Sequence, residues 1–234
     1  MNTVTGPLQG VKVVSCSTAQ AGTVPYTLMA DLGAEVIKVE TPGRGDPSRT
    51  AGQVEGYPSS YFETNNRGVK SLTLNLKDRR ALDILYKLVA DADIFGQNFR
   101  PGAAERNGFG YEDLKKINPK LVYASISGFG QSGPYKDLKG YDAVAQAMSG
   151  IMASTGEADR APVRVGPSMI DMGTGMYVVI GIMDALRKKD LTKDGAYLEF
   201  NLLDSALSWM SQSIANYSRT GVVPSRTGSA LASF

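Results

Sequence analysis

The chain has 234 residues, of which 42% are hydrophobic and 21% are charged, so it can bury the core of one large domain. Its 25 basic and 23 acidic side chains give a net charge of +2, which is too balanced for a protein whose main partner is a nucleic acid. It has no histidine and one cysteine, which excludes Ser-His-Asp catalysis, Cys-His catalysis and an internal disulfide, and argues against a zinc or iron site.

The same counts bear on where the protein works. The single cysteine, Cys16, suits a reducing cytoplasm. Segment 1–10 is polar without a hydrophobic signal core, and no continuous apolar run approaches the roughly 18 residues that span a bilayer. We expect a cytoplasmic protein without a metal site, a membrane partner or a nucleic-acid partner. Its chemistry would rest on carboxylates, lysines, tyrosines or backbone groups.

Strand and helix signals alternate from the N-terminus. Residues 11–15 predict a buried strand, a helix follows Gly22 and ends at Gly33, and residues 35–40 predict a second strand. Proline and glycine residues then mark a loop over 42–56. Short connections of this kind between strands and helices are typical of a parallel sheet.

The alternation continues through the rest of the chain. Residues 71–76 predict a strand, and Asp78 is placed to cap a helix whose Leu82, Leu85 and Val89 recur at helical spacing. The remaining predicted elements are strands at 94–98, 121–127 and 196–201, short helices opened by Pro101 and Tyr111, and helices at 142–148, 173–187 and 202–217.

Together these elements predict an α/β fold, a doubly wound, mostly parallel sheet in a Rossmann-like large domain. We assign residues 1–200 to this large domain and residues 201–234 to a helix and the start of a linker. The final residues, 226–234, read as mid-loop with no closing element. We therefore expect a truncated or incompletely supplied chain.

Segment 128–133, Gly-Phe-Gly-Gln-Ser-Gly, fits the dinucleotide fingerprint and follows a predicted strand. The fingerprint also needs a helix that starts within it and an acidic ribose ligand about 20 residues further on. Here Pro134 follows, and a helix is predicted only from Asp142. A nicotinamide-dependent reductase is therefore a minor alternative.

Two loops stand where ligands bind in open α/β sheets, just after predicted strands. In one, Arg100 and Arg106 could pair with phosphates and Asn98 with an amide or ribose edge. In the other, the small residues of segment 19–22 let a ligand approach a helix N-terminus. Taken alone, a turn with solvated arginines is the better explanation of the first loop, and an ordinary strand-to-helix turn explains the second at least as well.

Asp171 precedes a strongly apolar predicted helix. It is most simply a helix cap. The alternative is a nucleophile, since Gly173 and Gly175 would expose backbone amides that could stabilise an oxyanion. Asp142, at the start of its own predicted helix, is also most simply a cap.

Several segments stand in an order known from one family: 8–13, 19–22, 31–40, 43–46, 66–75, 98–102, 127–134 and 171–176. In this order they resemble the family III CoA-transferases, the group of formyl-CoA transferase, carnitine CoA-transferase and benzylsuccinate CoA-transferase. The resemblance covers nearly the whole chain from Pro7 onward.

The resemblance implies that Asp171 is the catalytic nucleophile. In family members this carboxylate attacks the donor acyl-CoA thioester and forms an acyl–aspartyl anhydride and CoA thiolate. The thiolate then attacks the aspartyl carbonyl, and the acceptor acid runs the sequence in reverse. Both nucleophiles are charged and need no imidazole base, which suits a chain without histidine.

The resemblance also implies coenzyme A or acyl-CoA as substrate, with no prosthetic group. The matching CoA-site residues are Gln20, Ala21, Leu74, Lys77, Asn98, Phe99, Arg100, Arg106 and Lys139. Tyr141 and Asp142 match residues beside the catalytic aspartate, and Thr41 stands where some members carry an arginine near the nucleotide.

One alternative and the partners follow from the same resemblance. The α-methylacyl-CoA racemase shares the fold but uses a histidine where this chain has Tyr141. Family members are typically longer and form interlocked dimers, so the small domain would be missing here. The expected partners are acyl-CoA, small carboxylic acids, and a second copy or a related subunit. A non-catalytic fragment that binds CoA or a partner chain is the main alternative, and a reductase the third.

The sequence does not identify the acids. Tyr57, Tyr61 and Phe62 are only suggestive of a larger, apolar acyl group.

Overall fold

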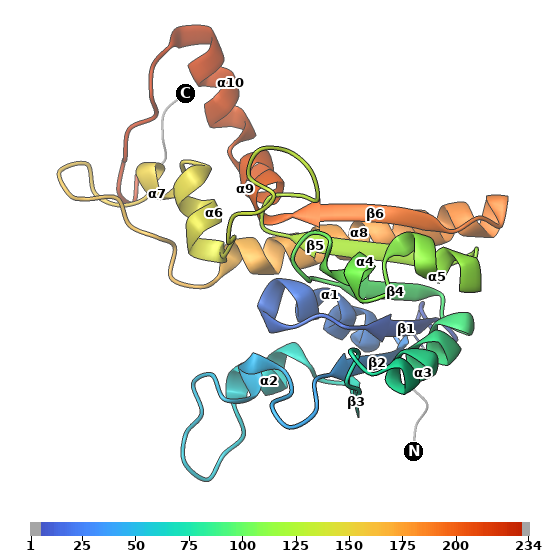
Figure 1. Ribbon diagram of the computed structural model, residues 1–234. Helices are drawn as coiled ribbons and strands as arrows, with labels where there is room; N and C mark the ends of the chain where they lie inside the picture. The colour runs from blue at the N-terminus through green and yellow to red at the C-terminus, as the bar shows by residue number, and fades with distance from the viewer. Residues whose placement is uncertain (1–5, 231–234) are drawn as a thin grey trace.

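The computed structural model describes residues 6–230. Within this range six strands form one sheet in the order β3-β2-β1-β4-β5-β6, and all of its neighbouring strands are parallel (Figure 1). The strands are β1 (Lys12–Ser15), β2 (Glu35–Glu40), β3 (Lys70–Thr73), β4 (Ile94–Gln97), β5 (Val122–Ser127) and β6 (Ala196–Asn201). The predicted doubly wound α/β fold is confirmed.

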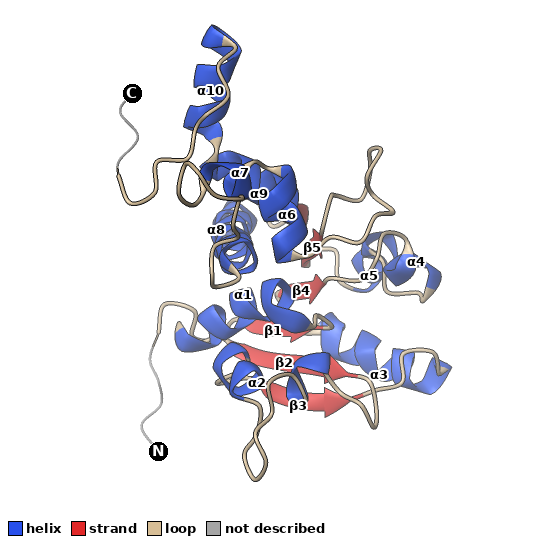
Figure 2. Ribbon diagram, turned by 90° about the vertical axis from the view of Figure 1, so that its left-hand side faces the viewer, coloured by secondary structure: helices blue, strands red, loops and turns tan. Residues whose placement is uncertain are grey.

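Helices cover both faces of the sheet. They are α1 (Ala19–Asp31), the 3₁₀ helix η1 (Pro47–Arg49), α2 (Ser60–Asn65), α3 (Arg79–Ala90), α4 (Ala103–Arg106), α5 (Tyr111–Ile117), α6 (Asp142–Met148), α7 (Ile151–Ser154), α8 (Met169–Thr192), α9 (Leu202–Trp209) and α10 (Ser211–Thr220). Figure 2 shows α1 and α8 on one side of the strands and α3, α4 and α5 on the other. Figure 1 shows α10 extending away from the body, and none of its residues is buried.

Alternate residues of each strand supply two separate cores, as the period-two geometry of a strand requires. Val13 and Ile94 belong to the core beneath α1 and α8, whereas Val14 and Phe95 belong to the core beneath α3 and α5. Because both faces are covered, the central strands are almost continuously buried. The sheet therefore forms a rigid frame whose carboxyl edge carries the loops described below.

The cap predicted for the helix after the third strand is confirmed. The Asp78 carboxylate accepts a hydrogen bond from Arg80 N at 2.9 Å, and Leu82, Leu85 and Val89 of α3 are buried. This pattern is local to about a dozen residues, which is why the sequence shows it plainly.

Several predicted boundaries are wrong, among them those of the helix predicted over 173–187, which is α8 and runs from Met169 to Thr192. The strand predicted over 71–76 ends at Thr73, because β2 ends at Glu40 and its last carbonyl oxygen accepts the bond from Leu74 N at 2.9 Å. The helix predicted over 202–217 is two helices that meet at Met210, whose N–H bonds Leu207 O at 3.0 Å and tightens the last turn of α9. The loop predicted over 42–56 contains η1, with Pro47 at its first position.

Among the described residues, α8 is the one helix long and apolar enough to cross a membrane, by length and composition only. Its Val178, Ile182 and Ala185 are buried in the core shared with α1. A core helix passes the same test as a membrane span. The predicted boundary at residue 200 stays a prediction, although Leu202 of α9 lies in this core as well.

Candidate functional site

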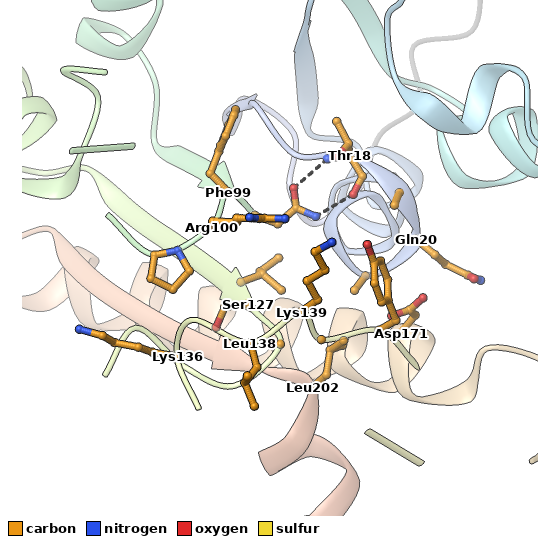
Figure 3. A pocket seen from close by; sticks show the side chains of 18 residues that line it. Thr18, Gln20, Phe99, Arg100, Ser127, Lys136, Leu138, Lys139, Asp171 and Leu202 are labelled. Carbon is orange, nitrogen blue, oxygen red and sulfur yellow. Dashed lines mark hydrogen bonds between the residues drawn. The ribbon is translucent and has the colours of Figure 1, made fainter. Parts of the chain in front are cut away.

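The strand order reverses between β1 and β4, and a cavity of about 280 Å³ opens at their carboxyl ends (Figure 3). Parallel sheets bind ligands at such a reversal, because the two following connections diverge to opposite faces. The cavity is lined by the first turn of α1, segment 98–101 after β4, the loop between β5 and α6, Asp171 of α8 and Leu202 of α9.

Asn98 fixes the start of α1 at the rim of this cavity. Its Oδ1 accepts a hydrogen bond from Thr18 N at 2.9 Å, and its Nδ2 donates to Thr18 O at 2.7 Å (Figure 3). Thr18 is the N-cap of α1 but makes no side-chain cap bond. Of the first-turn amide groups of α1, Ala19 N donates a long hydrogen bond to Asp46 Oδ1 at 3.4 Å. The positive end of the helix dipole lies at the cavity.

The helix predicted to follow Gly22 begins earlier, at Ala19. Gly22 lies inside α1. A Cβ at this position would sit 2.5 Å from Asn98 Nδ2, so a glycine is needed for Asn98 to pack here. The glycine thus permits close packing rather than ending the turn. Ala19 has a φ of +57°, which strains a residue that carries a Cβ.

Asp171 lies in the first turn of α8 and not before it, so the prediction that it caps the helix is wrong. Gly173 and Gly175 were predicted to expose amides, and this is wrong as well, because both are buried inside the helix. Their lack of side chains has a packing reason. A Cβ on Gly173 would lie 2.1 Å from the Trp209 ring, and one on Gly175 would lie 2.6 Å from Val24.

Asp142 caps α8 rather than its own helix. Its side chain is buried, with Asp142 only 6% exposed. Oδ2 accepts hydrogen bonds from Ile170 N at 2.7 Å and Asp171 N at 3.1 Å, and Oδ1 accepts one from Gln146 Nε2 at 2.5 Å. Asp142 does not line the cavity. It supports, from behind, the turn that carries Asp171.

The setting of Asp171 disfavours its charged form. Burial raises the pKa of the Asp171 carboxyl to about 7, and the nearby Asp142 charge adds to the rise. Burial also raises the pKa of Tyr61, on α2, to about 12, and the Asp171 charge contributes. The Tyr61 hydroxyl lies 3.5 Å from Gln20 Oε1, so α2 and the start of α1 meet beside Asp171.

The three aromatic side chains considered for an acyl group lie in different settings. Tyr57 is 70% exposed, and Phe62 packs under the Arg49 guanidinium, whose carbon is 3.9 Å from the ring centroid. Arg49 in turn bonds Glu40 at 2.6 and 2.8 Å. Only Tyr61 lies beside Asp171.

A second cavity, of about 230 Å³, adjoins the first across Asn98 and Phe99, which line both. It also contains Leu74, Lys77 and Thr41. The two cavities together provide an extended space that runs from α8 past the end of β4 to the loops after β2 and β3.

Most of the predicted CoA-site residues meet in these two cavities. The first holds Gln20, Ala21, Asn98, Phe99, Arg100 and Lys139, together with Tyr141 and Asp171, and the second holds Leu74 and Lys77. Arg106 lines neither and is exposed on α4. Figure 3 shows the Lys139 side chain reaching toward the middle of the first cavity.

The fingerprint-like segment 128–133 is a loop, and the next helix begins at Asp142. Its Gly128 packs against Gly140, since a Cβ on Gly128 would lie 2.6 Å from the Gly140 Cα. This contact folds the loop back on itself and returns Lys139 and Tyr141 to the cavity. The glycines serve the loop rather than a pyrophosphate.

Sequence reasoning assigned no role to several cavity residues, among them Thr18, Ser127 and Lys136. Thr18 and Ser127 end or follow predicted strands, which is the available signal for them. Lys136 carries no such signal, because only the fold-back of the loop brings it to the cavity. No group of three or more potential metal-ligating side chains occurs among residues 6–230.

Known proteins resemble this chain in sequence and in fold. The chain is 43% identical over 224 residues to the acetyl-CoA:oxalate CoA-transferase of Acetobacter aceti, covering 95% of this chain and 58% of that protein. It is 43% identical over 212 residues to the human succinyl-CoA:glutarate CoA-transferase, covering 90% of this chain and 48% of that protein. The crystal structure of a CAIB/BAIF family protein from Brucella suis matches with a TM-score of 0.91 and 41% identity, over 96% of this chain and 60% of that one.

The chain therefore spans about half to three-fifths of the length of these relatives. The sequence pattern of one family, described as CoA-transferase family III, matches residues 8–233. That match extends over both cavities and every strand described above. The chain belongs to CoA-transferase family III.

Proposed function

We propose that the protein transfers coenzyme A from an acyl-CoA donor to a carboxylic acid acceptor, with Asp171 as the nucleophile. The observation that carries the proposal is a carboxylate of raised pKa, about 7, at the wall of a cavity that the first turn of α1 also lines. A carboxylate with a high proton affinity is a strong nucleophile toward a carbonyl carbon. Above pH 7 it is also largely ionised.

The steps balance without an acid or base from the protein. An Asp171 oxygen bonds to the thioester carbonyl carbon, the C–S bond breaks, and CoA leaves as thiolate. The thiolate then attacks the aspartyl carbonyl, the anhydride C–O bond breaks, and the donor acid leaves as carboxylate. The acceptor carboxylate displaces CoA thiolate from the aspartyl thioester. That thiolate finally attacks the acceptor acyl carbon and restores the Asp171 carboxylate.

The cavity walls suit the charges in this sequence. Each addition puts negative charge on a carbonyl oxygen, and the first-turn amide groups of α1 carry the positive end of a helix dipole. Arg100, Lys136 and Lys139 line the same cavity and can pair with the CoA phosphates. The second cavity has room for another part of the extended CoA molecule.

Relatives named for oxalate and glutarate support small dicarboxylic acids as the acceptor class. Acetyl-CoA and succinyl-CoA, also from those names, are the first donors to test. We further propose a cytoplasmic protein that pairs with a second copy or a related subunit. Light scattering coupled to gel filtration measures that association.

The central experiment uses the longest protein that the gene encodes. Asp171→Ala and Asp171→Asn are expected to reduce CoA transfer by at least about a thousandfold, while the affinity for CoA stays within about threefold. Hydroxylamine added during turnover should modify Asp171 of the unaltered protein. Wild-type transfer by Asp171→Ala would sink the mechanism. Firm CoA binding with no transfer to any acid would support a non-catalytic CoA-binding protein instead.

A further inference from the structure

A small buried polar cluster adjoins the backbone of Asp171, and its side chains do not line the cavity. Its centre is Asp142, whose carboxylate accepts three hydrogen bonds, from Ile170 N, Asp171 N and Gln146 Nε2. Gln146 is fully buried, and its Oε1 accepts a bond from Val165 N at 2.9 Å. The cluster thus joins α6 to the segment that leads into α8.

The hydrogen bonds require a carboxylate at position 142. All three partners of the Asp142 side chain are N–H groups, and an ionised carboxyl group accepts at both oxygens. An asparagine would turn its NH₂ group either toward Gln146 Nε2 or toward the backbone amides, where donor would face donor. A carboxylate is therefore the side-chain group that accepts from all three N–H donors at this buried position.

We propose that Asp142 is a positioning residue for Asp171: it holds the Ile170 and Asp171 amide groups, and its fixed negative charge favours the states in which Asp171 is uncharged. The inference rests on the proposed function, in which those states are the anhydride and the thioester. Forming the anhydride moves the negative charge from Asp171 to the departing thiolate. When that thiolate forms the thioester, the charge passes to the departing donor carboxylate, so Asp171 is uncharged in both states. Asp142 thereby favours acylation of Asp171 without touching the substrate.

Other groups around Asp171 define its charge environment. Asp142 faces it from α6, Tyr61 from α2, and Lys139 lines the same cavity from the loop before α6. Burial is the first cause of the raised pKa of Asp171 and the Asp142 charge is the second. Removing that charge should therefore lower the pKa of Asp171 only part of the way to its ordinary value near 3.8.

Three variants separate the charge from the hydrogen bonds. Asp142→Asn removes the charge. The double variant Asp142→Asn with Gln146→Glu exchanges donor and acceptor, so each hydrogen bond of the cluster keeps a partner while the charge moves one side chain deeper into α6. Asn118→Ala is the matched control, since the Asn118 side chain also makes three hydrogen bonds, with Val89 O, Ala92 O and Lys120 N, at the amino-terminal edge of the sheet.

Two measurements report on each variant in the longest protein that the gene encodes. The first is the carboxyl-carbon NMR titration of Asp171 in the free protein, assigned by its loss in Asp171→Asn. The second is the rate at which acetyl-CoA or succinyl-CoA acylates Asp171, with thermal unfolding and CoA affinity measured alongside. The titration needs no turnover, so it tests this inference even where transfer itself is not found.

Asp142→Asn is expected to lower the titration midpoint of Asp171 by about one pH unit and acylation by about tenfold, with CoA affinity within about twofold. The double variant should regain most of the thermal stability but keep the lowered midpoint and the slower acylation. Asn118→Ala should lose stability with an unchanged midpoint. A double variant that regains the wild-type midpoint and rate together with its stability would overturn the inference, as would an unshifted midpoint in Asp142→Asn.

Discussion

The N-termini of α1 and α8 border the same cavity but are completed differently. In the first turn of α1 the N-cap side chain, Thr18, caps no amide group and Ala19 N makes a long hydrogen bond of 3.4 Å to Asp46 Oδ1, so most of the first-turn amide groups lie open beside the cavity. The first turn of α8 is capped by the buried carboxylate of Asp142. An anionic ligand group is therefore favoured at α1, whereas α8 already holds an internal anion and presents a carboxylate of its own.

The two ends also differ in what their supporting side chains do to stability. Asn98 satisfies both the N–H and the C=O of Thr18, so the support of α1 stabilises the fold. At α8 burial disfavours the charged form of Asp171, and the nearby charge of the supporting Asp142 carboxylate adds to this effect. The hydrogen bonds at the start of α1 thus stabilise the fold, whereas the ionised Asp171 carboxylate at the start of α8 destabilises it. This contrast makes separate predictions for the two ends.

The largest expected effect is a pH-dependent stabilisation by Asp171→Asn. The pKa of Asp171 is raised in the folded protein to about 7 from 3.8, so the folded state binds the proton more tightly than the unfolded state does. Ionising Asp171 in the folded protein therefore costs free energy. That cost is absent below about pH 4, grows as the pH rises from about 4 to 7, and is complete above about 7. Asp171→Asn should raise the free energy of unfolding at pH 8 by about 2–4 kcal/mol.

Urea unfolding of both proteins at pH 4, 6 and 8 measures this difference. The gap should be small at pH 4, intermediate at pH 6 and largest at pH 8. Other titrating groups cancel, because they are common to both chains. An equal gap at every pH would show that Asp171 titrates normally and that the α8 end carries no charge strain.

The contrast between the two ends also shows which features a sequence can predict. The strands and α3 follow from spacing within a dozen residues, and the segment order sufficed for the family. The starts of α1 and α8 did not follow. Gly22 and Gly173 looked like helix boundaries, yet both lie inside helices. They are glycines because Asn98 and Trp209, far along the chain, pack where a Cβ would be.

The same limit applied to Asp142. By sequence it precedes its own helix and looks like that helix's cap, but its partners are the amides of Ile170 and Asp171, 28 and 29 residues away. No periodicity encodes such a contact. Motif order singled out Asp171 as the candidate nucleophile, whereas the reason for its altered acidity required the three-dimensional arrangement.

At the α1 end, Asn98→Ala should destabilise the fold by about 1–3 kcal/mol, because it leaves the N–H and C=O of Thr18 without their partner. CoA affinity should fall as well, since the first turn of α1 loses the side chain that fixes its position at the cavity. Thermal unfolding and calorimetric CoA titration measure the two effects. Asn118→Ala is the control, and it should lose stability without losing CoA affinity. Equal CoA affinity in Asn98→Ala and wild type would mean that α1 needs no such support.

The smallest expected effect is on CoA binding by an arginine outside the two cavities, compared with an arginine that lines the first. Arg106 lies outside both cavities on an exposed face of α4, while Arg100 lines the first. An exposed cation contributes through screened attraction, so Arg106→Ala should weaken CoA binding by about two- to fivefold at low salt and leave the turnover rate unchanged. Raising the salt should remove that difference. Arg100→Ala should weaken CoA more and keep much of its effect in salt, because its partner phosphate would lie within the cavity. If Arg106→Ala proves the more harmful of the two at both salt concentrations, the CoA phosphates lie nearer α4 than the α1 end, and the assignment of anionic groups to the α1 end must be redrawn.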